Sequence, residues 1–409
     1  MFSLPRTNPF LLAEQCDITA AGLAAHQQVM DGYSRLRDFH PASMNWLVPH
    51  FEHVLIGGVR TIASFADYYR QTKGVRSRLI IYNPQADASA YHERLTSAFP
   101  DYPAEDVIAL PNGDVSAIPD ADAVMATFWP TAYLALRFNR TRAKFYFMQD
   151  FESLFYASGT EAALADATYR FGLYGVCNSP GVGDAYRAAS GVPTVAFWPA
   201  VDTSVFSPLP PGIPKHAPGE PKQVVFYGRP QRPRNAFALG MEVIARLKEA
   251  LGDGVRIVSA GAEWRPADYG MADAMEVLGL LPTLESVADL YRHCDAGLIF
   301  MMTKHPSYQP LEYMACGCPT VSNHNPANHW LLRDGENCLL CEPSISCVTD
   351  RLLAVLTDEK LSARIIEGGL MTVAGASWEQ EMERVWRFIC KSGLDQMSRQ
   401  RLAIPQRGS

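Results

Sequence analysis

Three arginines stand close together in the stretch YGRPQRPRNAFALG, residues 227–240. Arg229 directly follows the apolar run QVVFYG, and Arg232 and Arg234 precede a segment with helical spacing. Guanidinium groups bind phosphate oxygens in a bidentate way, so three of them at a strand-to-helix turn suit a polyanion such as a diphosphate. A single such arginine would more often be a solvated surface residue. We therefore predict that Gly228, Arg229 and Arg234 bind an anionic ligand.

A second charged stretch is LIFMMTKHPSYQPLEYMACG, residues 298–317. Lys304 comes just after an apolar strand, and Ser307 is predicted to cap a helix that holds Glu312. A lysine near a helix N-terminus is repelled by the helix dipole unless an anion lies between them, and such misfits mark functional sites. Glu312 could accept hydrogen bonds from sugar or ribose hydroxyls, or pair with Lys304. We predict that Lys304, Ser307, Tyr308 and Glu312 contact the ligand.

Carboxylates also follow the apolar run of KFYFMQDFESLFY, residues 144–156. Gln149, Asp150 and Glu152 would lie at the carboxyl end of a parallel strand, which is where ligands of such sheets bind. Asp150 could contact an acceptor molecule or stabilise a developing cation. Capping of a following helix by Asp150 or Glu152 explains the pattern nearly as well.

A pair of glycines ends the apolar run HVLIGG, residues 53–58, which we predict to be a strand. Glycine lets a backbone approach a ligand closely, and the start of the following helix would favour an anion. Gly57 and Gly58 are therefore candidate ligand contacts. The motif is not GxGxxG, so it gives little support to a dinucleotide, and an ordinary tight turn is the alternative.

The sequence gives little reason to expect a metal. Asp120 and Asp122 form a DxD motif, but it precedes the strand AVMATFW on the side away from the expected site. Cys316-Gly-Cys318 and Cys338-Leu-Leu-Cys341 are not placed on turns typical of zinc sites. The nine cysteines are an odd number scattered along a long chain, which favours reduced thiols.

Short apolar runs alternate with helical stretches along the whole chain, which predicts parallel sheets covered by helices on both faces. The segment SPLPPGIPKHAPGEPK is rich in proline, as linkers are, and the alternation restarts after it. We predict an α/β protein with two Rossmann-like domains that face each other across a cleft. The expected parts are an N-terminal domain, a linker, a C-terminal domain and a final helix with a tail that braces the domains, at residues 1–207, 208–222, 223–376 and 377–409.

Composition narrows the classes of partner. The 409 residues carry a net charge of −7, and 19% are charged, so nucleic acid is not the expected partner. The N-terminus lacks the long apolar region of a secretory signal, and no run of 18 apolar residues indicates a membrane span. We expect a cytoplasmic protein. Peripheral membrane contact stays open, and the oligomeric state is not indicated.

Several stretches together resemble the retaining glycosyltransferases of family 4, which have the GT-B fold. WPAVDTSVFSP resembles the segment that leads into their second domain, and YGRPQRPRNAF resembles their donor-phosphate loop. KHPSYQPLEYMACGCPTVSN resembles their E-x7-E block, with Glu312 as the second glutamate, and HWLLRDGENCLLCEPS resembles the passage beyond it. GGVRTIASFADYY and YFMQDFESLFY are most similar to bacterial rhamnosyltransferases that use dTDP-β-L-rhamnose in S-layer glycan synthesis.

The resemblance implies a nucleotide-sugar donor, with dTDP-rhamnose as the donor of the most similar subgroup, a saccharide acceptor and no metal or other cofactor. Lys304 departs from the family, because it stands where the first glutamate is expected. Gln149 and Asp150 stand where many relatives have a histidine. A lysine could help Arg229 to neutralise a leaving diphosphate. The alternatives are a nucleotide-sugar epimerase or phosphorylase of the same fold, or a relative that binds nucleotide sugars without turnover.

Overall fold

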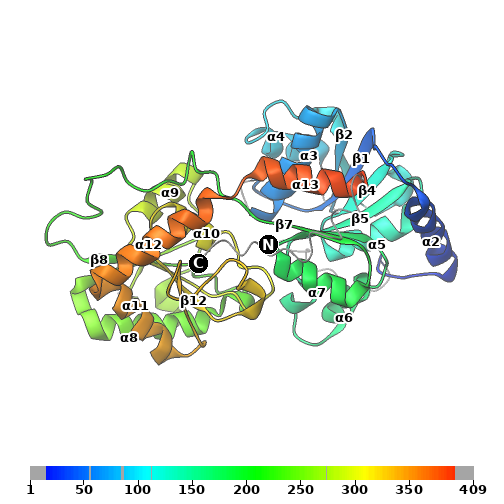
Figure 1. Ribbon diagram of the computed structural model, residues 1–409. Coiled ribbons are helices and arrows are strands. Elements are labelled where there is room, and N and C mark those ends of the chain that lie inside the picture. Colours follow the sequence, from blue (N-terminus) through cyan, green and yellow to red (C-terminus); the bar gives the residue numbers. More distant parts are fainter. Residues whose placement is uncertain (1–14, 55–56, 84–86, 112, 273, 392–409) are drawn as a thin grey trace. The chain divides into compact units, whose positions relative to one another are not determined.

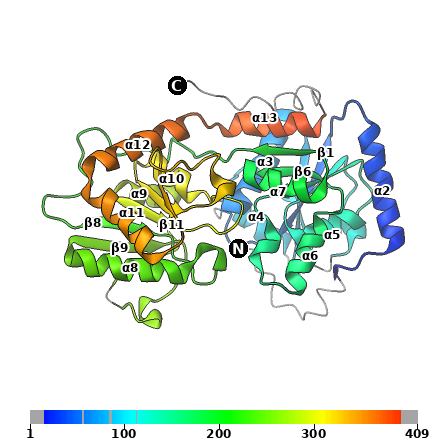
Figure 2. The ribbon, with the colours of Figure 1, turned by 60° about the horizontal axis from the view of Figure 1, so that its bottom comes forward.

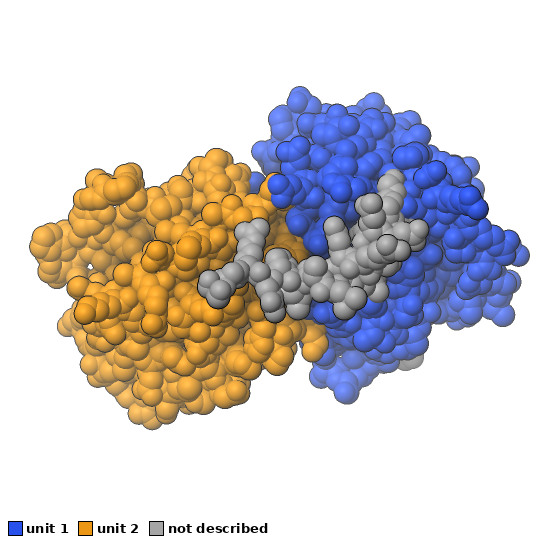
Figure 3. All heavy atoms as spheres, viewed as in Figure 1, with its two compact units in different colours: residues 1–197, 379–409 blue, residues 198–378 orange. Residues whose placement is uncertain are grey.

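The computed structural model describes residues 15–391 apart from 55–56, 84–86, 112 and 273. The chain divides into two compact units, which Figure 3 colours separately. Unit 1 consists of residues 1–197 and 379–409, and unit 2 consists of residues 198–378. Each unit is built around its own parallel sheet, so the predicted α/β class is confirmed.

Unit 1 contains a sheet with the strand order β3-β2-β1-β4-β5-β6-β7, and every neighbouring pair is parallel. Its strands are β1 Ser43–Pro49, β2 Arg76–Tyr82, β3 Val107–Leu110, β4 Ala123–Ala126, β5 Ala143–Met148, β6 Tyr174–Asn178 and β7 Thr194–Phe197. Its helices are α2 Ala20–Arg35, α3 Gly57–Lys73, α4 Ala88–Thr96, α5 Trp129–Arg137, α6 Thr160–Thr168 and α7 Pro180–Ser190. The order reverses between β1 and β4, which makes the carboxyl ends of these strands the natural ligand position.

The prediction of a strand at residues 53–58 is wrong for residues 53–54 and 57–58, and residues 55–56 lie outside the described part of the chain. The strand is β1, Ser43–Pro49, and α3 already begins at Gly57. The residues of SMNWLVP are buried except for the first, so this segment has the continuous burial of a strand inside a parallel sheet. Proline is found at the ends or edges of strands, and Pro49 accordingly is the last residue of β1, opposite Tyr82.

Both faces of the unit 1 sheet are covered by aromatic and aliphatic side chains. On one face, α5, α6 and α7 pack against β-strand residues that include Leu47, Val124 and Tyr146. On the other face, rings from α3 contact rings of the strands, as in the pairs of Phe65 with Phe147 and Phe197. Figures 1 and 2 show α3 and α7 together with the strands of this sheet.

The C-terminal helix α13, Trp378–Ile389, belongs to unit 1 from its second residue onward. The ring of Trp386 lies 5.0 Å from that of Tyr69 on α3. The Tyr69 hydroxyl donates to the carbonyl of Met382 at 3.1 Å, and Lys73 forms an ion pair with Glu383 at 2.5 Å. The end of the described chain is therefore tied to a helix near its beginning.

Unit 2 contains a parallel sheet with the strand order β10-β9-β8-β11-β12-β13. Its strands are β8 Lys222–Phe226, β9 Val255–Ala260, β10 Glu276–Gly279, β11 Ala296–Ile299, β12 Thr320–Asn323 and β13 Leu339–Cys341. Its helices are α8 Phe237–Leu251, α9 Leu284–Arg292, α10 Gln309–Ala315, α11 Ile345–Thr357 and α12 Glu359–Ala374. The order reverses between β8 and β11.

Alternate side chains along β8 show how this sheet is covered. Val224 and Phe226 face a core formed with α8 and α11, whereas Val225 faces a second core formed with α9 and α10. Figure 2 shows α8 below β8 and β9, and α10 and α12 above them. A glycine fits where α8 meets the sheet, because a Cβ at Gly240 would lie 2.3 Å from the Phe226 ring.

The proline-rich segment that we predicted as a linker, residues 208–222, groups with unit 2. Lys215 donates to the carbonyls of Cys294 and Gly317 at 2.6 and 2.8 Å. His216 lies 2.6 Å from a carboxylate oxygen of Asp295, and the same carboxylate accepts from the backbone of Gln223. The segment is thus attached to the amino-terminal edge of the unit 2 sheet by polar contacts.

Candidate functional site

Two loops follow the strands at which the order of the unit 2 sheet reverses. Residues 227–236 connect β8 to α8, and residues 300–308 connect β11 to α10. Because β8 and β11 are neighbouring parallel strands, both loops leave the sheet at its carboxyl edge. Ligands of open α/β sheets bind at this kind of position. The charged residues predicted to bind a ligand in the second half of the chain all lie in these loops or at the start of α10.

The first loop begins with a close contact between strands. A Cβ at Gly228 would lie 2.7 Å from the Ser259 hydroxyl at the end of β9, so a larger residue does not fit there without movement. Arg229 then donates from Nη1 to the Tyr227 hydroxyl at 2.8 Å, and its guanidinium carbon lies 5.4 Å from the centre of the same ring. Tyr227 therefore holds Arg229 in a defined position.

The three arginines of this loop form one cationic cluster. Burial, together with the positive charges of Arg229 and Arg234, lowers the pKa of the Arg232 guanidinium to about 9. Within the described chain, the Nε atom of Arg229 and the Nη1 atom of Arg232 are buried and have no hydrogen-bond partner. Unsatisfied buried donors and mutual repulsion are both unfavourable, and a bound anion would relieve both.

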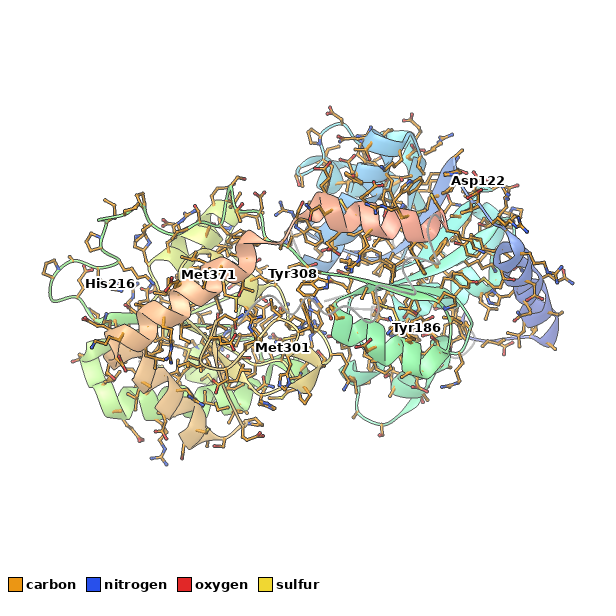
Figure 4. All side chains as sticks on the ribbon, in the orientation of Figure 1. Asp122, Tyr186, His216, Met301, Tyr308 and Met371 are labelled. Carbon is orange, nitrogen blue, oxygen red and sulfur yellow. The ribbon has the colours of Figure 1, made fainter. Side chains whose placement is uncertain are left out.

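The second loop is held by amide side chains from neighbouring elements. Asn325, just past β12, donates to the carbonyls of Met301 and Thr303 at 3.0 and 2.6 Å. Asn323 accepts from the Met301 N–H at 2.8 Å and donates to its carbonyl at 3.1 Å. Figure 4 labels Met301 at the start of this loop. These contacts fix the backbone just before Lys304.

Lys304 and Glu312 are both partly buried and belong to the same unit. Glu312 lies in the first turn of α10, and its backbone N–H donates to the carbonyl of Tyr308 at 3.0 Å. The predicted effect of a helix dipole on Lys304 is small, because α10 has only seven residues. Lys304 belongs to the β11 loop, in which the Met302 N–H donates to the carbonyl of Arg234 in the β8 loop at 2.9 Å.

The prediction that Ser307 caps α10 was wrong. Tyr308 occupies the N-cap position, and no side chain caps the helix. Ser307 instead has a φ of +70°, a left-handed conformation that favours glycine, and its hydroxyl contacts the side chain of Gln309. The Tyr308 ring, labelled in Figure 4, lies 5.7 Å from the ring of His305 and 6.2 Å from that of Trp378.

His305 belongs to the same loop, and sequence reasoning passed over it. Its ring is buried, and burial together with the charge of Arg234 lowers its pKa to about 3. Its Nδ1 atom accepts a hydrogen bond from the Ser307 N–H at 2.9 Å. The sequence around His305, a lysine before it and a proline after it, matches no motif that predicts a function. Only the folded chain shows that the ring is buried in this loop.

The candidate residues of unit 1 meet at the carboxyl edge of its sheet. Gln149, just past β5, donates from its amide to the carbonyl of Gly58 at 2.9 Å, which brings two of the predicted segments together. Asp150 is buried, and its carboxylate accepts from the N–H of Phe151 at 2.8 Å. Glu152 accepts from the Tyr146 hydroxyl at 2.7 Å and begins a short 3-10 helix.

A polar group after β1 was missed because the strand itself was misplaced. The Tyr91 hydroxyl contacts Nδ1 of His50, and Asn83 donates to both groups at 3.0 Å. Burial, with a contribution from Arg94, lowers the pKa of His50. These residues follow β1 and β2 at the same edge as Gly58, so they are further candidates for contact with a ligand of unit 1.

Asp120 and Asp122 lie at the opposite edge, before β4. Asp122 accepts from the backbone of Ala42 and Ser43 at 2.9 and 3.2 Å, and Asp120 pairs with Arg140 at 2.6 Å. This agrees with the interpretation of the DxD motif as structural. All nine cysteines are free thiols. In the part of the chain that the structure describes, no group of three or more His, Cys, Asp or Glu side chains is arranged to hold a metal.

Family models match both units. The model for the N-terminal domain of WsaF matches residues 43–176, and the model for the C-terminal domain of WsaF matches residues 222–353. The chain belongs to the WsaF family. The two matched segments contain the β8 and β11 loops of unit 2 and the Gly58 and Gln149 segments of unit 1.

One curated relative of this WsaF-family chain is the O-antigen biosynthesis protein RfbC of Myxococcus xanthus. The two are 43% identical over 350 residues, which is 85% of this chain and 27% of RfbC. The chain therefore spans about a quarter of the length of the relative that it matches.

Solved structures agree on the fold. Sucrose-phosphate synthase from Thermosynechococcus elongatus has a TM-score of 0.62 at 13% identity, over 88% of this chain and 98% of that one. HepE from Anabaena, solved with UDP and glucose, has a TM-score of 0.62 at 15% identity, over 87% and 99%. WaaG, a glycosyltransferase involved in lipopolysaccharide biosynthesis, has a TM-score of 0.60 at 13% identity, over 85% and 99%. The fold is thus the GT-B fold of glycosyltransferases.

No helix among the described residues is long and apolar enough to cross a membrane.

Proposed function

We propose that this WsaF-family chain is a glycosyltransferase that moves a sugar from a nucleoside diphosphate to a saccharide acceptor. The observation that carries the proposal is the cluster of Arg229, Arg232 and Arg234 at the carboxyl edge of β8, next to the β11 loop. Two buried guanidinium nitrogens of this cluster have no partner in the described chain. A diphosphate supplies the charge and the acceptor oxygens that such a cluster needs.

The same cluster suits the chemistry of transfer. The diphosphate gains negative charge as its bond to the sugar breaks, and fixed donors aimed at that charge lower the barrier. We propose that Arg229, Arg232, Arg234 and Lys304 supply this stabilisation in place of a divalent ion. Glu312 would accept hydrogen bonds from hydroxyl groups of the donor, and the Ser307 and Tyr308 segment would lie beside the phosphates.

The acceptor would bind to unit 1, where Gly57, Gly58, Gln149 and Asp150 lie at the carboxyl edge of the sheet. Asp150 is the carboxylate that we propose to contact it. Retention of configuration would follow from attack on the side of the leaving group. A departing phosphate oxygen could then take the proton, so no protein nucleophile is required.

We propose L-rhamnose as the transferred sugar and a cell-surface glycan as the product. The similarity of several stretches to S-layer rhamnosyltransferases supports the sugar, and the name of RfbC, an O-antigen biosynthesis protein, supports the glycan. HepE was solved with UDP and glucose, so UDP-glucose is the donor to compare with dTDP-rhamnose.

The test is turnover of a panel of nucleotide sugars with and without saccharide acceptors, in buffer with EDTA. Arg229→Ala and Lys304→Ala should each reduce turnover and diphosphate binding by at least about tenfold. Unchanged values for both variants would remove the proposal. Turnover without any acceptor would indicate an epimerase, and tight donor binding with no turnover would indicate a binding protein.

A further inference from the structure

His305 lies in the loop that connects β11 to α10, at residues 300–308. Lys304 precedes it in the chain, and Arg234 is close enough for its charge to act on the ring. The side chain is buried and only 6% exposed. Neither the family models nor the resemblance gives this side chain a role.

The hydrogen bond from Ser307 fixes the tautomer of the ring. A backbone N–H can only donate, so Nδ1 of His305 carries a lone pair, and the single proton of the neutral ring is on Nε2. The turn that makes this contact has Ser307 at a φ of +70°. The ring is therefore oriented by its own loop, with Nε2–H as the free end.

That free end has no acceptor in the part of the chain that the structure describes. Among the residues that the structure describes, Nε2 of His305 is a buried atom without a hydrogen-bond partner. Leaving a buried donor unsatisfied is unfavourable, and such groups in native proteins usually have a ligand or an ordered water. Because the positive charge of Arg234 acts on this ring, the acceptor that best suits Nε2–H is an anionic oxygen.

We propose that the Nε2–H of His305 donates a hydrogen bond to a phosphate oxygen of the bound nucleoside diphosphate, as a neutral donor beside the cationic side chains. This inference rests on the proposed function and adds to it a residue that contacts the ligand. It also explains why a neutral ring is preferable to a further cation here: the ring adds a donor without adding charge to an already repulsive cluster.

Two substitutions separate this role from a purely structural one. His305→Asn keeps an amide oxygen near the position of Nδ1, so Ser307 retains its acceptor, but it removes the donor at Nε2. His305→Gln places an amide N–H near the position of Nε2 and gives up the acceptor for Ser307. Each variant and the wild type are titrated calorimetrically with UDP, dTDP, GDP and ADP and with the matching nucleosides.

We expect His305→Asn to weaken binding of the preferred nucleoside diphosphate about tenfold and to leave binding of the nucleoside unchanged. His305→Gln should stay within about threefold of the wild type for the diphosphate. The inference would be overturned if His305→Gln, and not His305→Asn, weakened diphosphate binding. It would also be overturned if His305→Asn weakened binding of the nucleoside and of the diphosphate equally. If the wild type binds no nucleoside diphosphate of the panel, the proposed function fails as well.

A spectroscopic measurement tests the contact without any substitution. In protein labelled with ¹⁵N-histidine, the His305 ring should show the Nε2–H tautomer in the free state. Its Nε2 proton signal should move downfield when the preferred nucleoside diphosphate is added, because a charged acceptor lengthens the N–H bond. A signal that keeps its position at saturation would overturn the inference while leaving diphosphate binding itself intact.

Discussion

The backbone N–H of Met302 donates a hydrogen bond to the carbonyl oxygen of Arg234 at 2.9 Å. This contact joins the loop after β8 to the loop after β11. Asn235 strengthens it by donating to the carbonyl of Phe300 at 3.1 Å. The arginine loop and the Lys304 loop are therefore held together within unit 2 by one backbone hydrogen bond and one from a side-chain amide.

Replacing Arg232 with alanine should weaken the binding of a nucleoside diphosphate without lowering the stability of the fold. The guanidinium is partly buried, and burial and its two arginine neighbours lower its pKa to about 9, so its removal relieves repulsion. We expect unchanged or higher resistance to urea without ligand and at least about tenfold weaker binding of a nucleoside diphosphate.

The matched control is Arg246→Ala. Arg246 lies on the exposed side of α8 and pairs with Glu249 at 3.1 Å, away from the arginine loop. Surface pairs of this kind contribute little, so both stability and diphosphate binding should stay close to the wild type. Equal loss of binding in the two variants would mean that general charge, rather than the cluster, attracts the ligand.

Asn325→Ala should loosen the β11 loop. The amide of Asn325 donates to the carbonyls of Met301 and Thr303, and its oxygen accepts from the N–H of Ala327 at 3.1 Å. Loss of these contacts should lower the free energy of unfolding by about 1–3 kcal/mol, as measured in urea, and should also weaken diphosphate binding. Full stability in this variant would show that the loop does not depend on Asn325.

Acid should destabilise the protein through His26. Its Nδ1 lies 3.1 Å from the Lys144 ammonium, its Nε2 lies 2.6 Å from the carbonyl oxygen of Phe171, and burial together with Lys144 lowers its pKa to about 4. The unfolded chain takes up this proton near pH 6.5, so stability is complete above that pH and falls as the pH drops to about 4. The loss from this group is about 3 kcal/mol.

The comparison for His26 is His26→Gln, which keeps an amide donor for Phe171 but does not titrate. Urea unfolding of both proteins at pH 7 and pH 5 isolates the contribution of the ring. The wild type should lose more stability than the variant between these pH values. Parallel losses would mean that His26 is protonated in the folded protein as easily as in the unfolded chain.

Two glycine substitutions test how the helices pack. A Cβ at Gly240 in α8 would meet the Phe226 ring at 2.3 Å, so Gly240→Ala should destabilise the protein by about 1–3 kcal/mol. A Cβ at Gly32 in α2 would have no atom within 4 Å, so Gly32→Ala should stabilise it by about 0.5–1 kcal/mol. Thermal unfolding measures the stability of both variants. Equal changes in the two variants would contradict the close packing of α8 on β8.

The parallel sheets could be predicted because their strands are continuous apolar runs, as in VVF of β8 and FYFM of β5. The first strand was predicted at residues 53–58 instead of β1, Ser43–Pro49, because HVLIGG is a short apolar run that ends in glycines. The N-cap of α10 is Tyr308 and not the predicted Ser307. This difference depends on the φ angle of Ser307, which residue types do not specify. The roles proposed for Arg232 and His305 could not be predicted, because the burial of these side chains appears only in the folded chain.

The central claim is that side-chain cations of unit 2 hold the diphosphate of a sugar nucleotide. The most direct measurement is calorimetric titration of nucleoside diphosphates into the wild type and Arg232→Ala, both in EDTA. The account predicts saturable binding of at least one diphosphate by the wild type without a metal, and binding at least about tenfold weaker in the variant. Absence of binding until Mg²⁺ is added, or equal affinities in the two proteins, would contradict it.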